Sequence, residues 1–181
     1  MLRAKRLMVV ALLGIVAACD GPTETPIAGG DLLGVDADQV VFGMTSYLSA
    51  SGVREGRVMA DTMFMFNDSS SVLLRRMEVV FYDEDGRERA TITALSGEMD
   101  QNTDRMVARG NVVLMVHEDR RKIETPELHY DPVRDRIWSD STTVQTLADG
   151  SVSRGTAFRS DMTFQNMRVE NPRGALGETI F

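Results

Sequence analysis

Apolar and polar residues alternate in short runs along most of this chain, and the alternation is clearest from Arg57 onward. In residues 77–81 the odd positions are apolar; in residues 106–114 the even positions are apolar or small, and Arg109 and Asn111 fall between them. A period of two is typical of strands that bury one face. The runs predict strands over residues 57–66, 72–82, 90–99, 106–117, 122–130, 136–141, 143–147, 155–162 and 167–170.

The segments between these runs are polar and have the composition of tight turns. Asp-Gly pairs at residues 85–86 and 149–150 separate apolar runs, which is a strong hairpin signal because Gly tolerates positive φ. Residues 38–49 are predicted to form a first strand, with a short helix as the alternative. Small residues at Gly97, Ala108 and Gly110 predict where the sheet bends.

One turn motif recurs along the chain. Asp-Gln-Asn-Thr-Asp-Arg-Met-Val-Ala at residues 100–108 returns as Asp-Pro-Val-Arg-Asp-Arg-Ile-Trp-Ser at residues 131–139, and a fainter copy begins at Asp161. A single two-stranded unit cannot bury its apolar face alone, so repetition at this period indicates stacked hairpins. The pattern therefore predicts an all-β, antiparallel and repetitive structure.

The N-terminus has the organisation of an export signal. Arg3, Lys5 and Arg6 precede an uncharged apolar segment at residues 7–18, which is too short for a membrane span of about 20 residues. Residues 16–19, Val-Ala-Ala-Cys, resemble the lipobox of bacterial lipoproteins. We expect a lipoprotein signal peptide at residues 1–18, an acylated Cys19 with a flexible tether over residues 19–37, and a folded domain over residues 38–181. The alternative is an ordinary signal peptide cut after Ala18.

Composition narrows the possible functions. Removal of residues 1–18 takes away three of the 20 basic residues and none of the 27 acidic ones, which leaves a net charge of −10. Such a chain is a poor candidate for binding nucleic acid through its general field. We find no catalytic, phosphate-binding or dinucleotide-binding motif. His117 and His129 lack metal-ligand spacing and are interpreted as surface residues, so no metal, cofactor or enzymatic activity is predicted.

Three further features have two interpretations each. The 12 methionines suit either a groove for flexible acyl chains or ordinary core packing. The basic clusters at residues 75–76 and 120–122 could meet phosphates, or they could be solvated edges that oppose strand-to-strand aggregation. The acidic residues Asp83, Glu84 and Asp85 are interpreted as turn chemistry.

The repeat pattern resembles the LptC family, the periplasmic inner-membrane component of the lipopolysaccharide export bridge, and more distantly the OstA/LptA-like repeats of its partners. The resemblance covers about residues 38–174. It is carried by the segments Arg-Val-Met-Ala-Asp (57–61), Ala-Leu-Ser-Gly-Glu-Met-Asp (94–100), Ala-Arg-Gly-Asn-Val-Val-Leu (108–114), Ile-Glu-Thr-Pro-Glu-Leu-His-Tyr (123–130), Ile-Trp-Ser-Asp (137–140) and Gly-Thr-Ala-Phe-Arg-Ser-Asp (155–161).

The resemblance implies an open, V-shaped antiparallel β-jellyroll that passively carries lipopolysaccharide at the periplasmic face of the inner membrane. Its implied partners are lipopolysaccharide, the subunits of an inner-membrane ABC transporter, and another periplasmic OstA/LptA-like jellyroll protein that docks on a sheet edge. Well-known family members are anchored by a transmembrane helix, whereas this chain is expected to be held at the membrane by lipid on Cys19.

On this interpretation, the apolar face binds acyl chains. The residues expected to line the groove are Met65, Val79, Phe81, Ile92, Met106, Val112, Leu114, Ile123 and Ile137. The alternative is a structural or adaptor lipoprotein of the envelope with a closed β core and no lipid ligand. A carbohydrate-binding jellyroll would require exposed aromatic residues, yet Trp138 is the only Trp and aromatic residues make up 6% of the chain.

Overall fold

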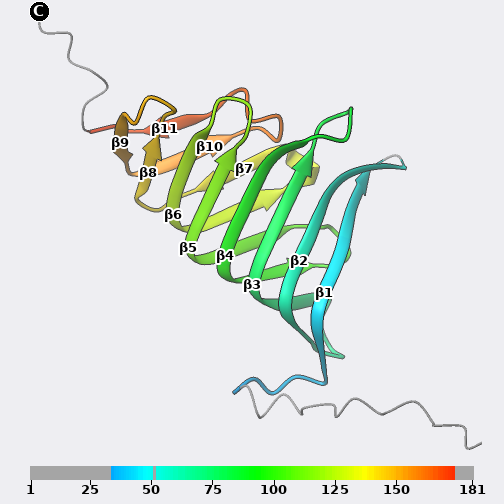
Figure 1. The fold of residues 1–181 in the computed structure, drawn as a ribbon. Coiled ribbons are helices and arrows are strands. Elements are labelled where there is room, and N and C mark those ends of the chain that lie inside the picture. Colours follow the sequence, from blue (N-terminus) through cyan, green and yellow to red (C-terminus); the bar gives the residue numbers. More distant parts are fainter. Residues whose placement is uncertain (1–33, 51, 174–181) are drawn as a thin grey trace, which may run out of the picture.

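The computed structural model describes residues 34–50 and 52–173, and these residues form one antiparallel β-sheet (Figure 1). The predicted signal peptide, Cys19 and most of the predicted tether lie outside the described residues, as do residues 174–181. The strands are β1 (Gln39–Ala50), β2 (Val53–Met65), β3 (Ser71–Tyr82), β4 (Glu88–Asp100), β5 (Met106–Val116), β6 (Arg121–Asp131), β7 (Arg136–Ser139), β8 (Thr143–Thr146), β9 (Val152–Gly155), β10 (Ala157–Ser160) and β11 (Arg168–Glu170).

The six long strands pair in chain order, and the short C-terminal strands complete the sheet. The order is β1-β2-β3-β4-β5-β6-β7-β10-β11, while β8 pairs with β6 and β9. The helical alternative for residues 38–49 is wrong, because they form β1. Within residues 34–50 and 52–173 the helical content is one three-residue 3-10 turn, η2 (Pro132–Arg134), and no helix there is long enough to cross a membrane.

A line of irregular residues crosses the long strands near their middles. Gly43, Arg76, Gly110 and Asn111 have φ values of +65°, +48°, +77° and +48°. The ladder between β4 and β5 shifts register between Thr93 and Ser96, and the ladder between β5 and β6 shifts between Arg109 and Val112. Left-handed residues and bulges bend a strand sharply, so each long strand turns at this line, which we call the crease.

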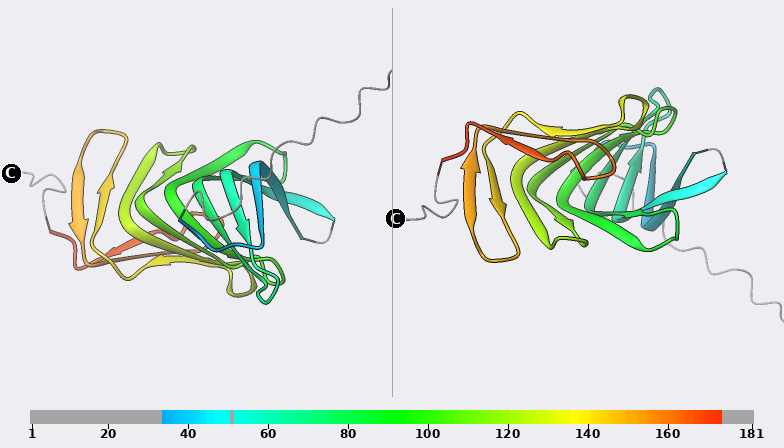
Figure 2. Two further views of the ribbon diagram at one scale, coloured as in Figure 1. Left: turned by 90° about the horizontal axis from the view of Figure 1, so that it is seen from below. Right: turned by 90° about the horizontal axis from the view of Figure 1, so that it is seen from above.

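The crease divides the sheet into two arms that face each other, which gives the V shape visible in Figure 2. The predicted open antiparallel β-jellyroll is therefore confirmed. Gly110 lies at the crease, as expected. Gly97 and Ala108 instead pair with each other in the regular ladder beside it. A Cβ on Gly97 would lie 2.1 Å from the Met77 sulfur, so this Gly makes room for a core side chain.

The first Asp of each repeated motif is the last residue of a strand, Asp100 of β4 and Asp131 of β6, and each forms a similar turn. The Asp100 carboxylate accepts hydrogen bonds from the backbone N–H groups of Asn102 and Thr103, both at 2.9 Å. The Asp131 carboxylate accepts one from the Arg134 N–H at 3.2 Å. The second Asp of each copy, Asp104 or Asp135, is left-handed, with φ of +55° or +48°. Asp can adopt this conformation at low cost, which explains why the motif recurs.

The C-terminal strands differ from those predicted. A single strand was predicted over residues 155–162, but β9 ends at Gly155 and β10 begins at Ala157. The prediction also missed residues 152–154 of β9, because Val152 is the one large apolar residue there and alternation gives no signal. Thr156 breaks the run, and its N–H donates to the Glu170 carbonyl at 2.9 Å.

Candidate functional site

The apolar faces of the two arms meet in one cluster. Eight of the nine residues predicted to line a groove are buried within it, each at most 4% exposed: Val79, Phe81, Ile92, Met106, Val112, Leu114, Ile123 and Ile137. The ninth, Met65, is half-buried and packs against the cluster. Arg109 and Asn111 are exposed, as the alternation predicted. The sequence therefore identified the inner face of the sheet correctly.

Sequence reasoning missed other members of the same cluster. The pattern of alternation already contained Val58, Val72 and Leu74, which are buried in this cluster. Tyr130 and Phe164 join Phe81 in an aromatic group, with ring centroids 5.4 Å and 5.7 Å from that of Phe81. Burial raises the pKa of Tyr130, because its phenol is held away from water. Phe164 lies in a polar segment without alternation, and no sequence signal marked it.

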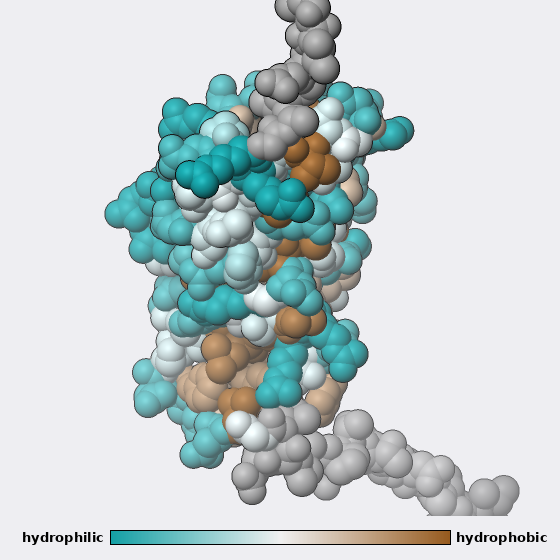
Figure 3. Space-filling view, turned by 90° about the vertical axis from the view of Figure 1, so that its left-hand side faces the viewer, coloured by the Kyte–Doolittle hydropathy of each residue, from teal (hydrophilic) through white to brown (hydrophobic). Residues whose placement is uncertain are grey.

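The interior is tightly packed in this structure. Its inward side chains fill the space between the arms, so a hydrocarbon chain can enter only if the arms separate or a side chain leaves. Apolar surface nevertheless reaches solvent on the side from which Figure 3 is viewed, and its largest patch lies in the lower part of that view. The interior is thus closed at its centre, while parts of the surface remain apolar.

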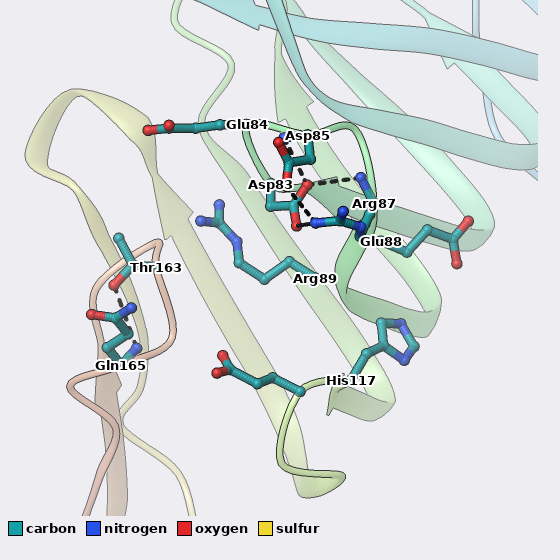
Figure 4. Close-up of a pocket in the computed structure, with 10 residues that line it drawn as sticks. Asp83, Glu84, Asp85, Arg87, Glu88, Arg89, His117, Thr163 and Gln165 are labelled. Atoms are coloured by element: carbon teal, nitrogen blue, oxygen red, sulfur yellow. Dashed lines mark hydrogen bonds and ion pairs between the residues drawn. The ribbon is translucent and has the colours of Figure 1, made fainter.

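Two cavities open near the hairpin between β3 and β4. One, of about 660 Å³, is lined by this hairpin, by His117 and Glu118 after β5, and by Thr163 and Gln165 (Figure 4). The second, of about 430 Å³, lies toward the start of β2 and the turn after β6. Both are lined by Asp83, Glu84, Arg89 and Thr163, so the side chains of Arg89 and Thr163 lie between them.

The acidic hairpin that borders both cavities is explained by turn chemistry, as expected. The Asp83 carboxylate accepts from the backbone N–H groups of Asp85 and Arg87 at 3.0 Å and 2.8 Å, and Arg87 forms an ion pair with Asp85. Arg89 extends into the larger cavity in Figure 4. Its guanidinium carbon lies 5.7 Å from the centre of the Phe164 ring, and its buried Nε has no hydrogen-bond partner in the described part of the chain.

The basic clusters and histidines have local partners. Arg76 pairs with Asp61 on the neighbouring strand β2 at 3.3 Å, Arg121 pairs with Asp119, and Lys122 pairs with Glu124 at 3.0 Å. Arg75 and Arg76 belong to β3, which lies between β2 and β4, so the interpretation of residues 75–76 as a sheet edge is wrong.

The two histidines lie on different strands or turns and do not approach each other in a metal-binding group. His117 is exposed and hydrogen-bonds to the Thr91 hydroxyl at 2.9 Å. The half-buried His129 ring stacks on Trp138, with centroids 4.8 Å apart. No group of three potential metal ligands occurs among the residues that the structure describes.

The chain was compared with known protein families and with solved structures. The sequence model of one family, described as "Lipopolysaccharide-assembly, LptC-related", matches residues 34–172. Among solved structures, the crystal structure of LptH, the LptA homologous periplasmic component of the conserved lipopolysaccharide transport device from Pseudomonas aeruginosa, is similar. Its TM-score is 0.49, with 15% sequence identity over 68% of this chain and 85% of that chain. No curated protein matches the chain significantly.

The family match, together with an open β-jellyroll whose two arms enclose an apolar cluster, indicates a binding or transport protein. The chain belongs to the LptC family, because the family's sequence model matches most of its length. The resemblance found in the sequence is thereby confirmed. Family membership supports a role in the lipopolysaccharide transport bridge and a periplasmic location.

Proposed function

We propose that this chain binds the acyl chains of lipopolysaccharide between the arms of its jellyroll and passes them toward another periplasmic jellyroll protein. The observation that carries this proposal is the apolar inner face, which continues from Met44 on β1 to Phe158 on β10. Each CH₂ group left in water costs about 0.8 kcal/mol, so lipid crossing an aqueous compartment needs a continuous apolar path. An inward face of this extent supplies such a path once the arms separate.

The sheet has the properties needed to extend that path into a neighbour. β1 pairs on one side with β2, and its other side is an edge of the sheet. At the opposite end, the sheet finishes with the short strands β9 and β11. Edge strands present backbone groups that can pair with a strand of another protein. We propose that one edge meets the subunits of an inner-membrane ABC transporter and that the other meets the next OstA/LptA-like jellyroll.

The proposal includes the anchor predicted from the sequence. Lipid on Cys19 would hold the domain at the periplasmic face of the inner membrane. A Cys19→Ala variant should move from the membrane fraction to the soluble periplasm and lose the mass of the acyl groups. The same distribution and mass in both proteins would contradict lipidation.

Photo-crosslinking tests the groove directly. A photoreactive amino acid is placed at the inward positions Met65 and Val112 and, as matched controls on the outer face, at Arg109 and Asn111. During ATP-driven export, the inward positions should capture lipopolysaccharide and the outward ones should not. Equal capture by both faces, or capture by neither, would contradict the proposal.

A closed adaptor without a lipid ligand is the second candidate, and the tight packing of the interior favours it. The two candidates differ in what co-purifies with the mature protein. Lipopolysaccharide and transporter subunits in the purified complex support the carrier. A lipid-free protein that still retains the other bridge components, and never crosslinks to lipopolysaccharide, supports the adaptor.

A further inference from the structure

We propose that the seat of Phe164, in the aromatic group with Phe81 and Tyr130, is a place where a hydrocarbon chain is taken into the interior, and that the Phe164 ring occupies it when no lipid is bound. This inference rests on the proposed function and specifies how the interior opens. Phe164 belongs to the segment between β10 and β11, residues 161–167, which we call the plug loop.

The plug loop is hydrophilic apart from the side chains it directs into the core. Thr163, Gln165 and Asn166 are exposed, whereas Phe164 is only 4% exposed. Met162 and Met167, at the flanks, are half-buried against the same core cluster. A single aromatic ring is thus inserted from a polar loop into an apolar site, where it takes the position that an apolar ligand would need.

The ring sits between the two arms, near the ends of their strands and away from the crease. Phe81, on β3, belongs to one arm, while Tyr130, at the end of β6, belongs to the other, and both rings are part of the same aromatic group as Phe164. The two cavities flank this place and share Thr163, which precedes Phe164 in the chain. Withdrawal of the plug loop would therefore join the cavities and expose the apolar surface of Phe81.

Few polar interactions oppose that withdrawal. The Met162 N–H donates to the Asp135 carboxylate at 3.0 Å, which ties the loop to the turn after η2. One more hydrogen bond joins the loop to the end of β10, where the Ser160 hydroxyl donates to the Asp161 carbonyl at 2.8 Å. Within the loop, the Asp161 carboxylate accepts from the Thr163 hydroxyl at 2.8 Å and from the Asn166 amide, and the Asp161 carbonyl accepts from the Phe164 N–H. Phe164 also has φ of +59°, a conformation that a bulky residue adopts only when its surroundings hold it there.

The charged residues around the larger cavity determine whether a phosphate group or a hydrocarbon tail can bind there. Asp83, Glu84, Asp85, Glu88 and Glu118 line the larger cavity, against Arg87 and Arg89 as the cations. Arg87 pairs with this acidic hairpin, and Arg89 lies over the Phe164 ring. The surplus of negative charge disfavours a phosphate group at this place, so the ligand that fits the seat is a hydrocarbon tail.

The proposal predicts that removal of the ring improves binding of an alkyl chain. The mature protein is titrated with an uncharged apolar fluorophore that carries an alkyl chain, and separately with lipopolysaccharide. Phe164→Ala should bind the fluorophore more tightly by a factor on the order of three or more, because the seat is no longer occupied. Phe42→Ala, the matched control, removes an exposed ring on β1 that lines neither cavity, and it should bind like the unchanged protein. Weaker or unchanged binding by Phe164→Ala would overturn the proposal.

A second variant tests the proposal even if Phe164→Ala does not fold. In Trp138→Phe combined with Phe164→Trp, the new indole is the only one, and its emission reports whether the ring is buried. Lipopolysaccharide should shift this emission to longer wavelength as the ring leaves its seat. An unshifted emission, together with crosslinking of lipopolysaccharide at Met65 and Val112, would reject the plug while leaving the carrier function intact. Absence of lipopolysaccharide binding in every protein would reject both.

Discussion

The Arg105 guanidinium lies 3.1 Å from the Asp131 carboxylate, and this ion pair joins two copies of the repeated turn. Asp131 is 2% exposed and also meets the Arg134 side chain at 3.0 Å. Burial alone would raise the pKa of Asp131. The hydrogen bond from the Arg134 N–H and the charge of Arg105 outweigh burial and lower that pKa.

Replacement of this carboxylate should therefore change how stability depends on pH. A lowered pKa means that the stabilisation is fully present above the ordinary pKa of Asp, 3.8, and is lost as the pH falls through the folded-state pKa. Asp131→Asn should lower the free energy of unfolding at pH 7 by about 1–3 kcal/mol and by much less at pH near 2, because charged hydrogen bonds of this kind are worth that much. Urea unfolding followed by Trp138 fluorescence measures both values.

The exposed pair between Asp61 and Arg76 provides the control for this experiment. Both side chains are more than half exposed, so Asp61→Asn should change the free energy of unfolding by less than about 1 kcal/mol. An equal loss for Asp131→Asn at pH 7 and at low pH would contradict the role assigned to its charge.

Gly155 permits a close approach between β9 and β11, and a larger residue should disrupt it. A Cβ at this position would lie 2.3 Å from the Glu170 carbonyl oxygen, which is backbone and cannot move freely. Gly155→Ala should destabilise the protein by about 1–3 kcal/mol, the usual cost of overpacking. Gly97→Ala is the matched control, because its closest clash is with the flexible Met77 thioether, and it should cost less. Thermal unfolding of both variants ranks them, and the reverse order would contradict this account.

The left-handed conformation of Asn111 at the crease should restrict what can replace it. Asn tolerates φ of +48°, whereas a β-branched residue does not. Asn111→Val should therefore cost about 1–2 kcal/mol, and Asn111→Gly should be nearly neutral. Denaturant unfolding gives both differences. An equally stable Val variant would mean that the crease does not depend on this residue.

Arg109 bridges three strands on the outer face. It lies 3.6 Å from Glu98 on β4 and 2.9 Å from Glu127 on β6, and Glu127 also meets His129 at 2.7 Å. Burial by itself raises the pKa of Glu127, but the hydrogen bonds from Arg109 and His129 lower it overall. Arg109→Met should raise the Glu127 pKa, as measured by carboxyl NMR titration. The free energy of unfolding should fall by only about 0.5 kcal/mol, because all three charges are partly exposed.

The sequence predicted the inner face of the sheet because a period of two fixes which side chains are buried. It did not predict the whole crease. Gly110 was recognisable as a flexible residue. Arg76 is left-handed without any composition signal, and Asn111, although Asn tolerates this conformation, was interpreted only as an outward polar residue. The two facing arms were expected through family resemblance, since alternation is the same in a flat sheet and in a folded one.

Some residues of the candidate site were likewise predictable from the sequence, and others were not. Val112 and Leu114 were identified because they continue the even-numbered positions of β5, which are separated by the polar Arg109 and Asn111 earlier in the strand. Phe164 was not, because its burial results from tertiary contact with Phe81 and not from any local period. The cavities beside it join segments far apart in the chain, such as the hairpin at Asp83 and the loop at Thr163, and no short-range pattern encodes such a meeting.

The crease has a mechanical consequence. Its left-handed residues are distributed over β1, β3 and β5, so the angle between the arms is set at several independent points along the molecule. A ligand bound between the arms at one level would separate the strands nearest to it and leave distant strands in contact. The open region would then move with the ligand from one end of the sheet to the other.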